Sequence, residues 1–133
     1  MRLAFLVVCI TLIGCSTKVS PKNIDWINGY WIIAKAEAPN GETRHFTGTV
    51  EVDFFEYNGS KGFRKKLKPI LGNQFNSTND AVGFTISFQK ELCVITYSRQ
   101  NHSWQEEVVS VNDEELLLKD GRGVLLYYKR YLP

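Results

Sequence analysis

The sequence has few of the residues that build metal centres, disulfide scaffolds or catalytic sites. Its 133 residues include three cysteines and two histidines, and none of these lie at the spacing of zinc ligands or of a paired-cysteine redox motif. A Gly-x-Ser-x-Gly motif and a Gly-rich phosphate loop are also absent. The acidic pairs Glu106-Glu107 and Glu114-Glu115 do not predict a carboxylate dyad, because neighbours on a strand face opposite sides of it. The sequence therefore indicates no enzyme, no metal site and no cofactor; an enzyme, the weakest alternative, would need convergent polar groups that the sequence does not reveal.

Neither a large excess of charge nor a long apolar run is present. The chain has 16 Lys and Arg residues against 14 Asp and Glu residues, a balance that does not suggest nucleic acid or a strongly acidic partner. The apolar run at residues 3–13 is about half as long as the ~20 residues that a membrane-spanning helix needs. Repeats and low-complexity tracts are absent, and the length suits one domain.

The first fifteen residues have the features of a secretory signal. Arg2 supplies a positive charge, a short apolar run follows, and the segment ends in Leu12-Ile13-Gly14-Cys15. This order is typical of a signal peptide, and its last four residues resemble a bacterial lipobox. The resemblance implies that residues 1–14 are removed and that Cys15 carries lipid. An ordinary signal peptide with a chance cysteine is the alternative.

Lipidation at Cys15 implies a protein anchored to a membrane of the bacterial cell envelope, since more than one acyl chain makes anchoring stable. Residues 15–23 then form a lipidated tether. Ser16, in place of the Asp associated with inner-membrane retention, predicts the outer membrane and a domain that faces the periplasm. Loss of Arg2 leaves 15 basic against 14 acidic residues. Cys93 is then the only free thiol, which excludes an intrachain disulfide and predicts a buried, inert side chain.

From residue 24 to residue 133 the pattern is one of strands and turns. The clearest alternation places Val82, Phe84, Ile86 and Phe88 on one face of a strand. A helix is expected only near Ile24–Ile27, and residues 71–80 read as a loop. The strands are expected at residues 29–37, 49–57, 63–68, 82–89, 92–98, 104–111, 116–119 and 124–131. About eight short strands are typical of an all-β barrel or sandwich, and closure into a barrel removes exposed edges.

Both ends of this region carry a second resemblance. Gly29-Tyr30-Trp31 opens the first strand and Tyr127-Tyr128-Lys129-Arg130 closes the last. Together with the lipobox they resemble the lipocalin superfamily, and specifically the small lipocalin-like lipoproteins of bacteria. The resemblance covers roughly residues 24–131 and implies an antiparallel up-and-down β-barrel of about eight strands. It also implies a structural motif of Gly29, Trp31 and Arg130. In that motif Trp31 plugs the closed end and Arg130 covers it, or Lys129 does so if the strand phase differs.

A barrel of about eight strands is either filled by side chains or holds one small ligand. Plentiful aromatic residues are candidates for the wall of such a pocket, and core packing is the alternative role for each of them. The candidate pocket residues are Phe54, Phe84, Phe88, Tyr97, Trp104 and Tyr128. The leading hypothesis is therefore a membrane-anchored lipoprotein, a monomer, whose barrel binds a small apolar or amphipathic molecule without catalysis.

A cluster of cations between residues 61 and 68 supports a different hypothesis. It consists of Lys61, Arg64, Lys65, Lys66 and Lys68. Such a patch fits lipid phosphates or an acidic partner, whereas the plain interpretation is a solvated edge strand whose lysines prevent aggregation. The alternative function is an envelope protein-interaction module with a filled barrel, acting as a scaffold, an inhibitor or an immunity-type lipoprotein.

Overall fold

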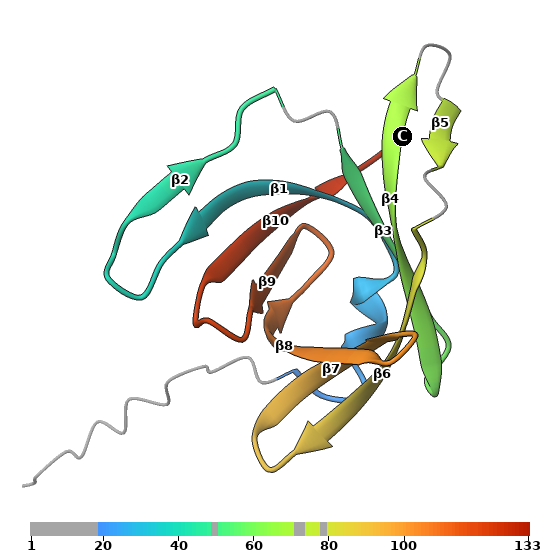
Figure 1. Ribbon diagram of the computed structural model, residues 1–133, viewed down its shortest axis with the longest axis vertical. Coiled ribbons are helices and arrows are strands. Elements are labelled where there is room, and N and C mark those ends of the chain that lie inside the picture. Colours follow the sequence, from blue (N-terminus) through green and yellow to red (C-terminus); the bar gives the residue numbers. More distant parts are fainter. Residues whose placement is uncertain (1–18, 49–50, 71–73, 78–79) are drawn as a thin grey trace, which may run out of the picture.

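The chain folds into a closed β-barrel (Figure 1). The computed structural model describes residues 19–48, 51–70, 74–77 and 80–133. Eight strands form the wall, each antiparallel to its neighbours, and the last pairs with the first. In order around the barrel they are β1 (Gly29–Glu37), β3 (Val52–Tyr57), β4 (Lys61–Ile70), β6 (Val82–Gln89), β7 (Leu92–Arg99), β8 (His102–Val111), β9 (Glu115–Lys119) and β10 (Leu125–Tyr131). This confirms the predicted up-and-down barrel, the architecture that lipocalins share.

The expected signal peptide at residues 1–14, the lipidation site Cys15 and the start of the tether lie outside the described residues. Between Val19 and the C-terminus the described chain contains every strand of the barrel and its core. No described helix is long and apolar enough to cross a bilayer.

Two short strands extend the sheet beyond the barrel, and the sequence does not predict either. β2 (Thr43–His45) pairs with the end of β1, and β5 (Gln74–Ser77) pairs with the end of β4. The expectations that the basic strand ends at residue 68 and that residues 71–80 form a loop are therefore wrong. Pro69 pairs with Phe75 of β5. At Pro69, β4 is hydrogen-bonded on one side only, to β5. Proline fits there because its missing N–H disrupts no ladder on the other side.

The two ends of the barrel differ. The 3₁₀-helix η1 (Ile24–Ile27) lies at one end, which we call the closed end, and β1 runs from it towards the opposite, open end. Because the barrel strands alternate in direction, the turns at residues 58–60, 90–91 and 112–114 also lie at the closed end. The segments at residues 38–42, 100–101 and 120–124 surround the open end.

The barrel core fills the interior from the closed end upward. Trp31, Phe55, Ile95 and Leu118 have no solvent exposure, and Val19 packs against the edge of the same cluster. On β7 the buried residues alternate with less buried ones, as the pleat of a strand requires. Apolar area removed from water by these side chains is the main stabilising contribution, at about 25 cal/mol per Å².

Trp31 and Arg130 meet at the closed end. The guanidinium carbon of Arg130 lies 4.0 Å from the centre of the Trp31 ring. The Arg130 Nη1 and Nη2 atoms donate to the carbonyl oxygens of Asn28 and Trp26, each at 2.6 Å. Gly29 has a φ of +119°, and a Cβ atom on it would lie 2.7 Å from Arg130 Nη1. The positive φ and the close approach of Arg130 explain why a glycine stands two positions before the tryptophan. The contact with the Trp31 ring comes from Arg130, while Lys129 is exposed.

Candidate binding site at the open end of the barrel

A cavity of about 630 Å³ opens at the end of the barrel opposite η1. Its wall is formed by β4, β6, β7 and β8 and by the turn at residues 120–121. The side chains that decide its chemistry are Arg64, Val82, Tyr97, Arg99, Trp104 and Glu106. The volume falls within the 300–1,000 Å³ that is usual for small-molecule pockets. Two aromatic rings, Tyr97 and Trp104, and the aliphatic Val82 lie in its lining, while charged and polar side chains make up most of the rest. A hollow this polar differs from the mostly apolar pockets usual for small molecules, so it fits a ligand that carries polar groups.

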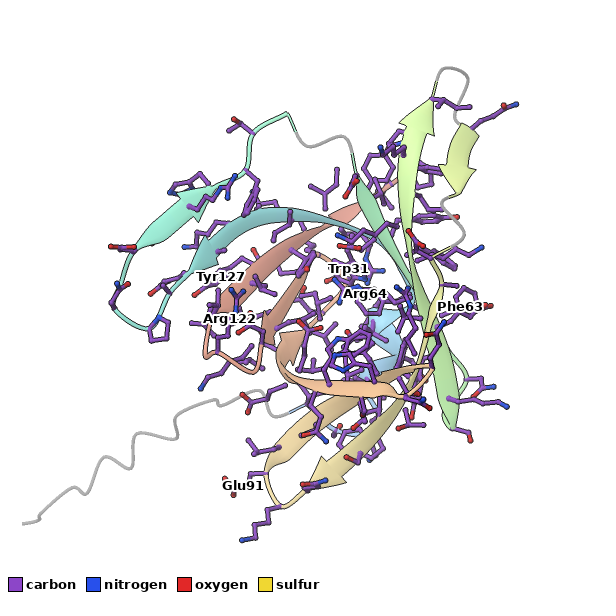
Figure 2. The ribbon with its side chains drawn as sticks, viewed as in Figure 1. Trp31, Phe63, Arg64, Glu91, Arg122 and Tyr127 are labelled. Atoms are coloured by element: carbon purple, nitrogen blue, oxygen red, sulfur yellow. The ribbon has the colours of Figure 1, made fainter. Side chains whose placement is uncertain are left out.

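Arg64 forms the floor of this cavity. Figure 2 shows Arg64 inside the barrel, whereas its neighbour Phe63 points away from it. This follows from the strand period of two, which sends adjacent side chains to opposite faces. The Arg64 side chain is 16% exposed. Its guanidinium carbon lies 4.7 Å from the centre of the Phe55 ring, so the cation sits directly on the apolar core.

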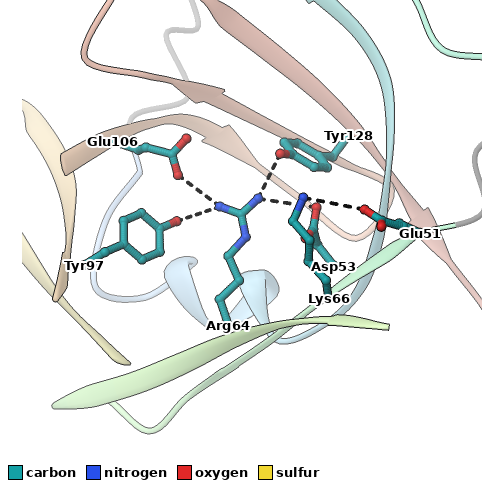
Figure 3. A network of polar contacts seen from close by, with 7 residues as sticks. All are labelled: Glu51, Asp53, Arg64, Lys66, Tyr97, Glu106 and Tyr128. Carbon is teal, nitrogen blue, oxygen red and sulfur yellow. Dashed lines mark hydrogen bonds and ion pairs between the residues drawn. The ribbon is translucent and has the colours of Figure 1, made fainter. Parts of the chain in front are cut away.

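Four side chains from four different strands surround the guanidinium (Figure 3). Nη1 donates to the Tyr97 hydroxyl at 2.9 Å and to Glu106 Oε1 at 3.0 Å. Nη2 donates to the Tyr128 hydroxyl at 2.9 Å and to Asp53 Oδ2 at 3.4 Å. We call these five residues the Arg64 cluster. It joins β3, β4, β7, β8 and β10 across the barrel, so it fixes the position of strands that are distant in the sequence.

The protonation states in the Arg64 cluster follow from burial and charge. Burial by itself lowers the pKa of Arg64, but the phenols and carboxylates around it outweigh that effect and hold the pKa well above its usual value. Burial raises the pKa of Tyr97 and of Tyr128. The guanidinium is therefore charged and both phenols are neutral near neutral pH. One cation and two carboxylates give the cluster a formal charge of −1.

The structure brings three of the six candidate pocket residues to this site. Trp104 and Tyr97 both line the cavity, and their rings stack with centres 5.4 Å apart. Tyr128 contributes its hydroxyl to the floor. Phe84 lies deeper, in the core, with its ring 5.8 Å from that of Tyr97.

The other two candidate pocket residues lie elsewhere. Phe54 is on the outer face of the barrel, where its ring packs 4.9 Å from Tyr30 and 5.9 Å from Phe63. Its neighbour Phe55 takes the inward position instead. Phe88 is 38% exposed beside the turn at residues 90–91, at the closed end. Phe54 and Phe55 are adjacent on β3 and therefore face opposite sides of the barrel wall. Phe88 is too far from the open end to reach the cavity.

The five cations of the candidate patch do not share one surface. Arg64 is inside the barrel, and Lys61 and Lys65 have the opposite strand phase, which places them outside. Lys66 Nζ lies 3.7 Å from Glu51 Oε2 near the open end, and Lys68 is exposed on the part of β4 that extends towards β5. The sequence cluster is therefore divided between the interior, the outer wall and the edge.

Asp53 and Glu106 are functional candidates that the sequence analysis does not identify. Both are buried charged residues at inward positions. The available signal is a single acid at the inward phase of an otherwise apolar strand: Asp53 shares its phase with Phe55, and Glu106 with Val108. Within the described parts of the chain, no group of three or more His, Cys, Asp or Glu side chains is placed to hold a metal ion.

A second hollow, of about 830 Å³, lies at the β3–β4 hairpin near the closed end. Phe54 and Phe63 border it from the outer face, and Asn28, Glu56 and Lys61 contribute polar atoms. It lacks the buried charged cluster of the open-end cavity, so we treat the open-end cavity as the candidate site.

Comparison with known proteins shows the fold but assigns no ligand. No family model and no curated protein matches this chain. A crystal structure of an uncharacterized protein from Bacteroides eggerthii DSM 20697 is similar over 80% of this chain and 100% of that one, with 11% sequence identity and a TM-score of 0.52. A crystal structure of a lipocalin-like protein from Bacteroides uniformis ATCC 8492 covers 80% of this chain and 99% of its own, with 8% identity and a TM-score of 0.49.

Proposed function

We propose that this chain is a lipid-anchored envelope protein whose barrel binds one small amphipathic molecule at its open end. The observation that carries the proposal is the cavity of about 630 Å³, with Tyr97 and Trp104 in a largely polar wall and a charged, hydrogen-bonded floor. Apolar parts of a ligand would gain about 25 cal/mol per Å² removed from water, and its polar part would meet the Arg64 cluster. The mechanism is passive binding by a monomer, without a catalytic step.

The polar floor supports an amphipathic ligand over a purely apolar one. A buried polar group costs free energy when a ligand covers it and offers no hydrogen bond in return. Glu106 and Tyr97 line the cavity, so an aliphatic chain alone would desolvate them without compensation. Trp104 and Val82 supply the apolar contact that the rest of the ligand needs.

The lipid anchor is part of the same proposal. Val19 packs against the core near η1, and the Ser20 carbonyl oxygen accepts hydrogen bonds from the backbone N–H groups of Asn23 and Ile24. Cys15 lies four residues before Val19, a reach of at most about 14 Å. A lipid on Cys15 would therefore hold the closed end close to the bilayer and leave the open end facing the periplasm.

The protein-interaction alternative receives less support. It depends on a continuous basic surface, and the five cations between residues 61 and 68 lie on different sides of the barrel wall. Arg64 in particular is occupied by partners inside the barrel.

The experiment is native mass spectrometry of the lipidated protein extracted from its own host into polymer nanodiscs, compared among three forms. Gly121→Trp places a large ring in the cavity lining, at a position where a Cβ atom meets nothing within 4 Å. Val109→Trp is the matched control, since Val109 is 37% exposed on β8 outside the cavity lining. We expect a co-purifying small molecule with the wild type and Val109→Trp, and its loss with Gly121→Trp. A bare mass in all three forms would contradict the proposal.

A further inference from the structure

The terminal guanidinium donors of the cavity floor are already in use. A guanidinium has five N–H donors in a fixed plane, and the two terminal nitrogens of Arg64 meet four partners within 3.4 Å. The fifth donor is the N–H of Nε. The Tyr97 and Tyr128 hydroxyls accept from Arg64, and each also carries one O–H donor. An anionic head group that approached Arg64 would have to displace a carboxylate that is already there.

The acceptors of the floor are in excess. Asp53 Oδ1 is a buried atom with no hydrogen-bond partner among the described residues. Glu106 contacts Arg64 through Oε1, and the carboxylate lines the cavity. Asp53 is not among the residues that line the cavity, so its unpartnered oxygen adds to the negative charge near Arg64, and Glu106 is the carboxylate that a ligand reaches. With two carboxylates and one guanidinium, the floor also repels a further negative charge.

The rim of the cavity does not reverse this preference. Lys66 and Arg99 line the cavity and Arg122 pairs with Asp120 at 2.8 Å, so three positive charges lie at the rim. Asp80 and Asp120 line the same cavity and Glu51 pairs with Lys66, so three carboxylates balance them. The Trp104 ring stacks with Tyr97 and with His102, whose ring centre lies 5.2 Å away, and it contributes apolar surface to the cavity.

From this geometry we infer that the open-end site selects amphipathic ligands whose polar end donates hydrogen bonds, above all a protonated amine, over ligands with an anionic head group. The inference rests on the proposed binding function and specifies its ligand class. The ammonium or hydroxyl group would bind at Glu106, and the aliphatic part would lie against Trp104 and Val82.

The test uses three probes that share one aliphatic chain and differ only at the head: laurylamine, lauryl alcohol and laurate. Each is titrated by calorimetry, below its aggregation threshold, into the chain from Ser16 to Pro133, which keeps every described residue. We expect laurylamine to bind most tightly and laurate roughly ten- to a hundredfold more weakly, the range that one hydrogen bond to a charged group supplies.

Two variants connect the preference to the floor. Glu106→Gln retains an oxygen that accepts from Arg64 but removes the charge. It should weaken the binding of laurylamine about tenfold or more and change the affinity for lauryl alcohol little. Glu107→Gln, on the opposite face of β8, is the matched control and should change neither probe. If Glu106→Gln fails to fold, Asp53→Asn takes its place with the same expected result.

Three other outcomes would contradict the inferred head-group preference. Laurate that binds as tightly as laurylamine, and is lost in Gly121→Trp, would overturn the inferred head-group preference and uphold the binding cavity. An unchanged preference for laurylamine in both Glu106→Gln and Asp53→Asn would also overturn it. If none of the three probes binds and no molecule co-purifies from the host, the binding function fails and the inference fails with it.

Discussion

Replacing Arg64 with methionine should destabilise the barrel by about 3–5 kcal/mol, because it leaves two buried carboxylates without their cation. The side chains of Asp53 and Glu106 are 12% and 9% exposed, so water does not compensate either of them fully. The change also removes the hydrogen bonds that the Tyr97 and Tyr128 hydroxyls accept. Methionine keeps an unbranched apolar side chain above Phe55, so a large cavity does not add to the loss.

The loss is measured by urea unfolding, followed by far-UV circular dichroism, at neutral and at mildly acidic pH. Unpaired buried carboxylates take up protons as the pH falls. The folded variant then binds more protons than the unfolded chain, so its stability should rise on acidification. Lys65→Met, one residue along β4 on the outer face, is the control and should cost no more than about 0.5 kcal/mol.

Two results would refute this reasoning. A loss below about 1 kcal/mol for Arg64→Met would mean that the carboxylates are solvated rather than held by the guanidinium. A loss of the expected size with no recovery at acidic pH would mean that Arg64 stabilises the barrel through packing and not through its charge.

Three further predictions concern the plug, the core thiol and the anchor. Trp31→Ala should cost about 3–5 kcal/mol in urea unfolding, since Trp31 is fully buried and its Nε1–H donates to the Ile27 carbonyl at 2.8 Å. Trp26→Ala, at a residue 50% exposed, should change the unfolding free energy little. Equal losses of unfolding free energy in the two variants would contradict the role of Trp31 as the plug. Burial raises the pKa of the Cys93 thiol from 9.0 to about 11. The unfolded chain therefore releases this proton first, and stability present below pH 9 declines as the pH rises towards 11. The stability of Cys93→Ala should decline less over that pH range, and an identical decline would contradict the raised pKa of Cys93. Cys15→Ser should leave an unprocessed or soluble precursor on envelope fractionation, and a cleaved form that stays with the membrane would contradict lipidation.

The eight barrel strands could be predicted because their inward residues are apolar at a period of two and their ends carry turn residues. The two strands outside the barrel could not. β2 consists of three exposed residues, so burial leaves no pattern there, and β5 follows a proline that usually ends a strand. The hairpin turns at Lys90 and Gln100 have φ values of +56° and +54°, where the favoured residues are Asn and Gly.

The candidate site could be predicted only in part, because strand phase decides it. Tyr97 and Trp104 face the cavity, whereas Phe54 belongs to the outer face and Phe55 to the core. The cluster of cations has the same difficulty. Five positive residues in eight positions suggest a patch, yet adjacent residues of β4 face opposite sides of the barrel wall. The partners of Arg64 come from β3, β7, β8 and β10, and no local pattern reveals contacts between residues 11 to 64 positions apart.

The proposed function requires that a small molecule binds in the open-end cavity. Nuclear magnetic resonance of the three indole N–H groups tests it directly, because Trp104 lines the cavity, Trp31 is buried at the closed end and Trp26 is exposed there. The ¹⁵N-labelled chain is titrated with a lipid extract of its host envelope, and the signals are assigned by single Trp→Phe changes. We expect the Trp104 signal to shift while those of Trp26 and Trp31 stay in place. A shift of Trp26 with no change at Trp104 would contradict the proposed function.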